Sequence, residues 1–158
     1  MAAGLPEHQL KIVLVEPEIP QNAGNIARMC AVIGAELHLV RPLGFFLGGR
    51  HLKRAGMDYL ERVQLTVHDN LADLRKRIGN DAYWLASARV ERAYWDVQYG
   101  KADWLVFGRE TAGLPGAWLA EGAERTITIP MRAGERSLNL STAAGVITFE
   151  VLRQLQYK

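Results

Sequence analysis

Cysteine is almost absent from this sequence of 158 residues, which contains only Cys30. A single thiol excludes a disulfide within the chain and a zinc site built on several cysteines. The four histidines lack the spacing of metal ligands, so we expect structural roles for them and no metal site: His8, His38, His51 and His68. The N-terminus has no signal-peptide pattern, and we therefore expect a cytoplasmic protein.

Long hydrophobic runs and an excess of one charge are missing too. No apolar run approaches the ~20 residues that cross a bilayer, so we expect no membrane-spanning segment. Nineteen Lys and Arg residues against seventeen Asp and Glu residues give a formal net charge of only +2. Any attraction to nucleic acid must then come from local clusters of basic residues. The length and a hydrophobic share of 49% predict one compact domain over residues 1–158.

Short strand-forming segments alternate with helix-like segments along the chain. Runs of β-branched and aromatic residues predict six strands: Ile12–Glu16, Glu36–Val40, Val63–Val67, Tyr83–Ser87, Trp104–Phe107 and Thr126–Ile129. The spacing of apolar residues predicts helices at Asn25–Ile33, at Leu71–Ile78 and from about Leu140 to Leu155. This alternation predicts an α/β fold, with a mostly parallel six-stranded sheet flanked by helices on both faces.

Three loops that follow predicted strands are dense in Gly, Pro, Asn and charged residues. The segment PEIPQNAGNIAR follows the first strand, GRETAGLP follows the fifth, and residues 130–139 follow the sixth. Ligands of parallel α/β sheets bind beyond the carboxyl ends of the strands. We therefore expect these three loops to meet in one binding site.

Several common sites do not fit these loops. The chain has no G-x-G, which a dinucleotide-binding Rossmann domain requires after its first strand. Gly108 and Gly113 have the glycine spacing of a P-loop, but Leu114 and Pro115 stand where Lys and Ser or Thr must be. The chain also lacks the G-x-S-x-G elbow of a serine hydrolase, so hydrolysis is not expected.

The three loops instead resemble the three motifs of the SPOUT methyltransferases, in the same order. The segments that carry this resemblance are NAGNIAR, LVFGRETAGLP and IPMRAGERSLNLSTAAG. The segments EPEIPQNAGNIARMCAVIG and RAGMDY further resemble the small bacterial members that methylate the wobble ribose of leucine tRNAs. The resemblance runs from Lys11 to Leu155 and includes no separate RNA-binding domain.

The resemblance implies a fold and partners that chain topology would not suggest. True knots are nearly absent from proteins, yet members of this family form a C-terminal trefoil knot. They bind S-adenosyl-L-methionine, release S-adenosyl-L-homocysteine and act as homodimers. The expected substrate is tRNA, recognised at its anticodon stem-loop. Without the resemblance, we would expect an open doubly wound sheet.

Site residues follow from matching the motifs position by position. The resemblance implies cofactor contacts at Ala86, Gly108, Ile129 and Ser137, with Leu138 and Leu114 as apolar neighbours of the adenine. It implies a catalytic set of Arg28, Asn22, Glu110 and Asn139. Each residue also has an ordinary alternative role: a turn for the glycine, a solvated surface position for the charged residues and a helix cap for Asn or Ser.

Arg28 is the central catalytic residue in this family pattern. A guanidinium hardly ever loses its proton in a protein, so Arg28 is a poor general base. Our hypothesis is that Arg28 holds the adjacent phosphate and stabilises the developing alkoxide. Glu110 is expected to pair with Arg28 and orient it. Ser141 is expected to cap the last helix, while Ser137 and Asn139 point into the site.

A basic window at residues 37–57 is the candidate RNA contact, because it contains no acidic residue. Phe45 and Phe46 within it could stack on an unpaired base or fill the core, and we expect at least one of them in the core. The basic residues expected to contact RNA are Arg41, Arg50, Lys53 and Arg54.

The resemblance also implies that the first and last helices pack against a second copy of the chain. The apolar residues that could supply this dimer surface, or belong to the core instead, are Met29, Cys30, Val151 and Leu155. Two alternatives to a wobble-ribose methyltransferase stay open at this point. One is a 2'-O-methyltransferase for another tRNA or rRNA position, and the other is a catalytically silent domain that binds RNA or senses an adenosine ligand.

Overall fold

A computed structural model describes residues 3–48, 50 and 57–158 of the chain. Its strands are β1 (Lys11–Val15), β2 (Glu36–Val40), β3 (Leu65–His68), β4 (Tyr83–Ala86), β5 (Trp104–Phe107) and β6 (Thr126–Ile127). Its α-helices are α1 (Pro20–Ile33), α3 (Leu71–Ile78), α4 (Gly116–Glu121) and α5 (Leu140–Gln156). Three short 3₁₀ helices complete this part of the chain: η1 (Met57–Arg62), η2 (Tyr94–Asp96) and η3 (Ala123–Arg125).

The strands form one six-stranded sheet in the order β3-β2-β1-β5-β4-β6, and every neighbouring pair is parallel. Val13 in β1, for example, lies opposite His38 in β2 and Val106 in β5. The carboxyl ends of all these strands therefore point to one edge of the sheet. This arrangement confirms the predicted parallel α/β sheet.

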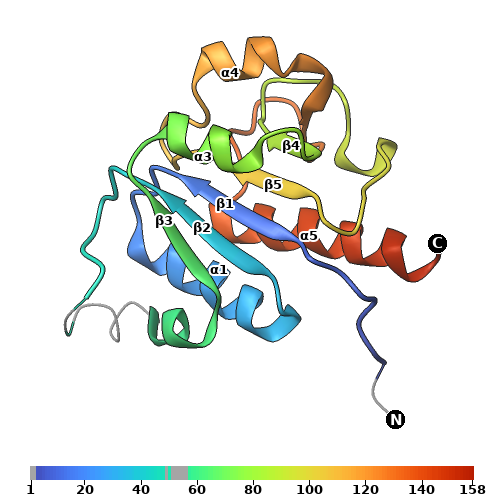
Figure 1. Ribbon diagram of the computed structural model, residues 1–158. Helices are drawn as coiled ribbons and strands as arrows, with labels where there is room; N and C mark the ends of the chain where they lie inside the picture. The colour runs from blue at the N-terminus through green and yellow to red at the C-terminus, as the bar shows by residue number, and fades with distance from the viewer. Residues whose placement is uncertain (1–2, 49, 51–56) are drawn as a thin grey trace.

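Helices cover both faces of the sheet (Figure 1). Side chains alternate along each strand, so Ile12 and Leu14 belong to the core under α1 and α5. Val13 and Val15 belong to the opposite core, under α3 and α4. Both α1 and α5 thus lie on the same face, and they pack against each other. Within the described residues, no helix is both long and apolar enough to cross a membrane.

The differences from the sequence prediction have local causes. The first helix begins at Pro20 rather than Asn25, because proline in the first turn has no amide hydrogen to lose and a backbone angle suited to helix. The last strand ends at Ile127, two residues early, and Thr128 forms only an isolated bridge with Ala93. Helix α4 was not predicted, since six residues starting with Gly116 are too few to show a periodic pattern.

Two of the histidines expected to have structural roles are buried. His38 is 1% exposed and His68 is 8% exposed, and their rings lie together, with His38 Nδ1 2.9 Å from His68 Nε2. His38 Nε2 lies 2.9 Å from a Glu36 carboxylate oxygen. Since a carboxylate only accepts, His38 donates from Nε2, and its Nδ1 accepts from His68. Both rings are neutral in this arrangement.

We expect this histidine pair to make the fold less stable in mild acid. Burial lowers the pKa of His38 and of His68 below the ordinary value of 6.5. As the pH falls below about 6.5, the unfolded chain takes up protons that the folded chain does not, so the free energy of unfolding decreases. Urea unfolding at pH 7.5 and 5.5 measures this loss. The double variant His38→Gln, His68→Gln should show a smaller loss, and an equal loss would contradict the assignment.

Candidate active site

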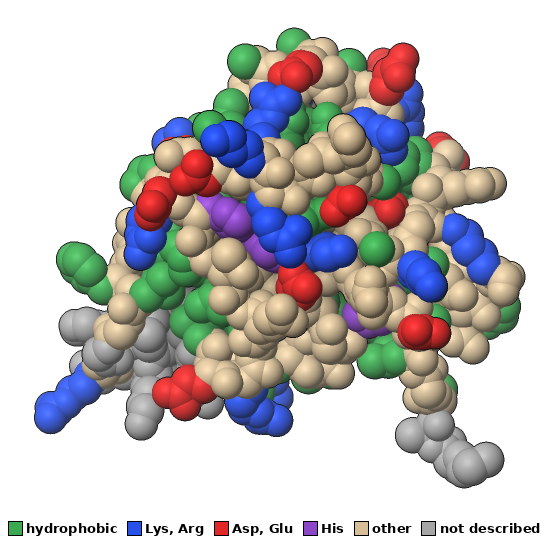
Figure 2. All heavy atoms as spheres, in the orientation of Figure 1, with side chains coloured by type: hydrophobic (Ala, Val, Ile, Leu, Met, Phe, Trp, Pro, Cys, Tyr) green, Lys and Arg blue, Asp and Glu red, His purple; other side chains and the backbone are tan. Residues whose placement is uncertain are grey.

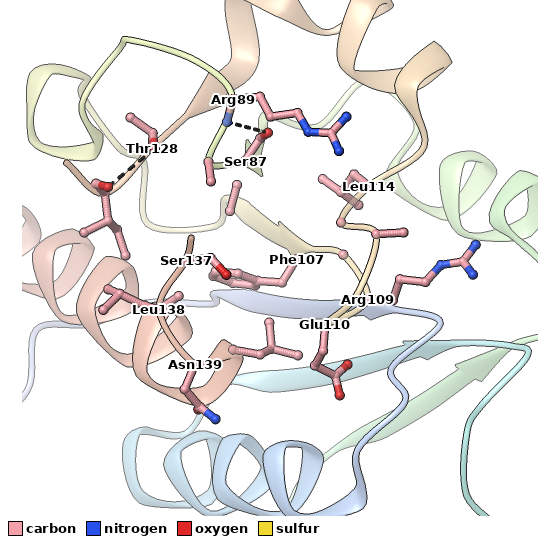
Figure 3. A pocket seen from close by; sticks show the side chains of 18 of the residues that line it. Ser87, Arg89, Phe107, Arg109, Glu110, Leu114, Thr128, Ser137, Leu138 and Asn139 are labelled. Atoms are coloured by element: carbon pink, nitrogen blue, oxygen red, sulfur yellow. Dashed lines mark hydrogen bonds between the residues drawn. The ribbon is translucent and has the colours of Figure 1, made fainter. Parts of the chain in front are cut away.

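A cavity of about 750 Å³ lies at the carboxyl edge of the sheet. It is bounded by the loops after β4, β5 and β6 and by the first turns of α1 and α5 (Figure 3). Asn22, Gly108 and Ser137, which come from three loops far apart in the sequence, all line it. The expectation that these loops meet in one site is therefore met.

The cavity also collects the residues matched to cofactor binding. The members of this set that line it are Ala86, Gly108, Leu114, Ile129, Ser137 and Leu138. Leu114 is 5% exposed and forms part of the core beneath the cavity, whereas Leu138 is 40% exposed at the cavity surface. The wall is thus partly apolar, with polar groups from the adjoining loops.

The loop after β1 and the loop after β5 hold each other through reciprocal contacts. Arg109 forms an ion pair with Glu16 at 2.9 Å. The Glu18 carboxylate accepts bonds from the Thr111 hydroxyl at 2.7 Å and the Thr111 amide at 3.1 Å, and the hydroxyl bond lowers the pKa of Glu18. Glu16 has a φ of 53°, a left-handed conformation rare outside glycine. These contacts fix the turn that leads into α1.

The Glu110 carboxylate binds backbone amides at the beginning of α1 and does not pair with the Arg28 guanidinium. Its carboxylate accepts bonds from the backbone amides of Glu18 at 2.9 Å and Ile19 at 2.6 Å. It also accepts a 3.4 Å bond from the side-chain amide of Asn22. The N-cap residue Ile19 makes no side-chain cap, so a carboxylate from another loop takes this role. The predicted pair between Glu110 and Arg28 is therefore wrong for this structure.

A hydrogen bond between two asparagines joins the third loop to the first. Asn139 donates from Nδ2 to Oδ1 of Asn22 at 3.0 Å. The oxygen of Asn139 accepts from the backbone amides of Ser141 and Thr142, so Asn139 is the N-cap of α5. The expectation that Ser141 caps this helix is wrong, since its hydroxyl donates to Asn139 instead. The side chains of Glu110, Asn22 and Asn139 thus connect all three loops.

Gly108 is required by a close approach of backbone to backbone. A β-carbon at this position would lie 2.1 Å from the carbonyl carbon of Gly113 and 2.3 Å from the nitrogen of Leu114. The turn is closed by a 2.9 Å bond from the Gly113 amide to the Arg109 carbonyl. Gly113 itself has a φ of +67°. The shape of the loop after β5 depends on both glycines.

Arg28 lies apart from the cavity formed by its own chain. It is six residues beyond Asn22 and about 240° further around α1. Its side chain is exposed, whereas that of Asn22 is buried. It is absent from the residues that line the cavity. Its guanidinium carbon lies 5.5 Å from the centre of the Tyr59 ring, and that of Arg62 lies 5.3 Å from the same ring. The structure therefore brings together Asn22, Glu110 and Asn139 but not Arg28.

The candidate RNA-contact residues lie on the segment after β2. Arg41 is exposed and pairs with Asp69 at 3.1 Å, and Arg50 is exposed. Lys53 and Arg54 lie outside the described residues, as does His51. Phe45 is partly buried against the core and Phe46 is exposed, which matches the expectation that at least one of them belongs to the core.

Sequence reasoning overlooked the loop after β4. Ser87 and Arg89 from this loop line the cavity (Figure 3), as does Arg136 from the third loop. The rule that ligands bind beyond the carboxyl ends of parallel strands applies equally to β4, so the charged segment ARVER was the available signal. Within the part of the chain that the structure describes, no group of three His, Cys, Asp or Glu side chains could hold a metal ion.

Comparison with known proteins agrees with this geometry. A tRNA (cytidine(34)-2'-O)-methyltransferase of Saccharophagus degradans is 44% identical over 147 residues, or 92% of this chain and 96% of that protein. A tRNA (cytidine(34)-2'-O)-methyltransferase of Burkholderia pseudomallei is 44% identical over 150 residues, or 93% of this chain and 96% of that protein.

Solved structures show the same fold. One described as "Structural insights into the 2-OH methylation of C/U34 on tRNA" matches with a TM-score of 0.89 at 44% identity, over 96% of this chain and 99% of that chain. An AdoMet-bound rRNA methyltransferase from Sinorhizobium meliloti matches with a TM-score of 0.81 at 27% identity, over 96% of this chain and 59% of that chain. Residues 9–149 also match the SpoU rRNA Methylase family. The chain therefore belongs to the SpoU rRNA methylase family and is a methyltransferase enzyme.

Proposed function

We propose that this enzyme transfers a methyl group from S-adenosyl-L-methionine to the ribose 2'-hydroxyl of the wobble nucleotide of tRNA. The proposed substrates are leucine tRNAs with cytidine or a modified uridine at that position. The observation that carries this proposal is the meeting of three loops in one cavity, joined by the side chains of Glu110, Asn22 and Asn139. The substrates of the two tRNA methyltransferases described above support the choice of RNA.

The cavity suits S-adenosylmethionine in size and chemistry. A volume of about 750 Å³ lies within the usual range for small-molecule sites. Leu114, Ile129 and Leu138 offer an apolar wall for the adenine, and Ser137 offers a hydroxyl. When bound, the cofactor supplies an activated methyl group on a sulfonium sulfur. S-adenosyl-L-homocysteine is the product.

The chain's own residues would orient the ribose and stabilise charge. Asn22 and Asn139 already hold each other beside the cavity, so their amides provide fixed positions for a sugar hydroxyl. Arg28 would bind the phosphate next to the methylated nucleotide and stabilise the negative charge that develops on the 2'-oxygen. Its permanently charged guanidinium suits this role, and the ribose proton would pass to water or a neighbouring group.

A homodimer is part of this proposal. Cys30 and Val151, which the sequence suggested for the interface, are both 0% exposed and belong to the core of a single chain. The exposed apolar residues on the two helices are instead Val32, at 67%, and Phe149, at 52%. Arg28 lies four residues before Val32 and therefore on the same face of α1. A partner packed on this face would enclose Arg28, and sedimentation of the purified chain tests the dimer.

Two further features complete the proposal. The chain after β6 would pass through a loop before forming α5, giving the trefoil knot of related methyltransferases. The enzyme would act in the cytoplasm, where tRNA is modified.

The direct test is incubation of the purified protein with labelled methyl donor and bulk tRNA, followed by nucleoside mapping. The proposal expects a 2'-O-methylated nucleoside at the wobble position. A stem-loop with 2'-deoxycytidine at that position is the matched control and should accept no label. Label at another nucleotide would favour an enzyme for a different RNA position. Cofactor binding without transfer to any RNA would favour a silent binding domain.

Tyr59 is expected to affect methyl transfer through its contact with Arg28. Replacing Tyr59 by leucine removes the aromatic ring that holds the Arg28 guanidinium in position, a contact that contributes about 0.5–1 kcal/mol at an exposed site. We expect kcat to fall by roughly 2- to 5-fold. The Tyr59→Phe variant keeps the ring and should retain the wild-type kcat. Equal losses in both variants would show that the hydroxyl, rather than the ring, matters.

A further inference from the structure

Phe46 is the most exposed of the large hydrophobic side chains in the described part of the chain, at 85%. Its neighbours behave differently, because Phe45 and Leu47 are partly buried and pack against the core under α1 and α5. Phe46 therefore points away from a loop whose other apolar side chains are anchored. Figure 2 shows hydrophobic side chains exposed along the left edge of the molecule, beside this part of the chain.

The loop that carries Phe46 is fixed to the active-site loop after β1. The amide of Gly44 donates a 2.9 Å bond to the carbonyl of Pro17. A β-carbon on Gly44 would lie 2.4 Å from the carbonyl oxygen of Glu18, so the two backbones touch. The amide of Glu18 is in turn bonded to Glu110, which lines the cavity. Phe46 thus lies two residues after Gly44, whose backbone contacts the loop between β1 and α1.

The charges on this loop match a polyanion. Arg41 comes before Phe46 and has a side chain that is 51% exposed, and Arg50 follows and is exposed. The facing acidic group is Asp69, which pairs with Arg41 at 3.1 Å and is itself 80% exposed. Residues 41–50 contain no acidic side chain. An exposed aromatic side chain that has an arginine on either side of it in the sequence suits a nucleotide, whose base has an aromatic face and whose phosphate is negative.

We propose that Phe46 stacks on an unpaired base of the anticodon loop, next to the nucleotide that is methylated. This inference rests on the proposed function and adds a residue that selects single-stranded RNA. The bases of a loop are free to stack on a protein, whereas paired bases are not. Because stacking does not depend on base identity, Phe46 contributes affinity for the loop rather than a choice of sequence.

The test measures the binding of a synthetic anticodon stem-loop to the full chain and to two variants. Phe46→Ala should weaken binding by about 5- to 20-fold and raise the KM for RNA, while kcat at saturating RNA stays near the wild-type value. Phe46→Trp should bind at least as well as the wild type. The matched control is Tyr157→Ala, which removes an aromatic side chain that is 81% exposed near the C-terminus. This variant should leave the affinity for the stem-loop, the KM for RNA and kcat at their wild-type values.

Stem-loops with a single abasic nucleotide then identify the stacked base. At one position beside the wobble nucleotide, removing the base should weaken binding to the wild-type chain about as much as Phe46→Ala weakens binding to the intact stem-loop. Combining the two changes at that position should cause no further loss of affinity. Additive losses at every loop position, or unchanged binding by Phe46→Ala, would overturn the inference. If the wild-type chain methylates no tRNA at all, the proposed function fails instead, and the two failures are distinguishable.

Discussion

Replacing Arg28 by lysine is expected to lower the kcat of methyl transfer by about 100-fold, a loss typical of removing one charge-stabilising donor from an active site. Lysine keeps the positive charge but loses the planar pair of donors that can bind a phosphate and a neighbouring oxygen together. Because Arg28 does not line the cofactor cavity of its own chain, the dissociation constant of the cofactor should change little. Single-turnover rates and calorimetric titration of the cofactor measure the two quantities separately.

Arg62→Lys is the control for this substitution. Arg62 lies over the same Tyr59 ring, at 5.3 Å, but follows no catalytic motif. Its replacement should leave kcat within about 2-fold of the wild-type value, since exposed contacts of this kind contribute little. An Arg28→Lys enzyme with unchanged turnover would end the assignment of Arg28 to catalysis.

Replacing Gly108 by alanine is expected to abolish cofactor binding and destabilise the fold. The added methyl group would lie about where the backbone of Gly113 and Leu114 already is, with the nearest atom at 2.1 Å. Backbone cannot rotate away as a flexible side chain can, so the loop after β5 must move. We expect a loss of at least about 2 kcal/mol in the free energy of unfolding, or roughly 5 °C in Tm. Thermal unfolding and cofactor titration measure both effects.

Gly116→Ala provides a matched glycine substitution eight residues further along. A β-carbon there meets nothing within 4 Å, and Gly116 is the first residue of α4. This variant should keep wild-type cofactor affinity and a wild-type or slightly higher Tm, because alanine favours helix over glycine. Similar Tm losses in the two variants would mean that crowding at Gly108 is not the cause.

The sheet was predictable because each strand carries its own local signal. The strand Trp104–Phe107 and the helix Leu71–Ile78 have the predicted bounds, because the apolar pattern and the residues that end it lie close together in the sequence. The cavity was predictable for a related reason, because parallel strands bring their following loops to one edge. The resemblance to the SPOUT motifs then identified several of its lining residues, and membership of the SpoU methylase family confirms that resemblance.

Side-chain pairing was not predictable in the same way. Glu110 could bond a guanidinium or a row of free backbone amides, and only the folded positions of Glu18 and Ile19 decide between them. Asn139 and Ser141 can both cap a helix, and their relative geometry selects Asn139. The burial of Cys30 and Val151 likewise depends on how α1 and α5 meet, because an amphipathic pattern does not distinguish a core from an interface.

The bonds among Glu110, Asn22 and Asn139 have a consequence for the energetics of ligand binding. Three segments that would otherwise have to be ordered by the ligand are joined before it arrives, so little conformational entropy is lost on association. The pocket is preorganised for the small molecule, whose affinity should then depend mainly on its direct contacts.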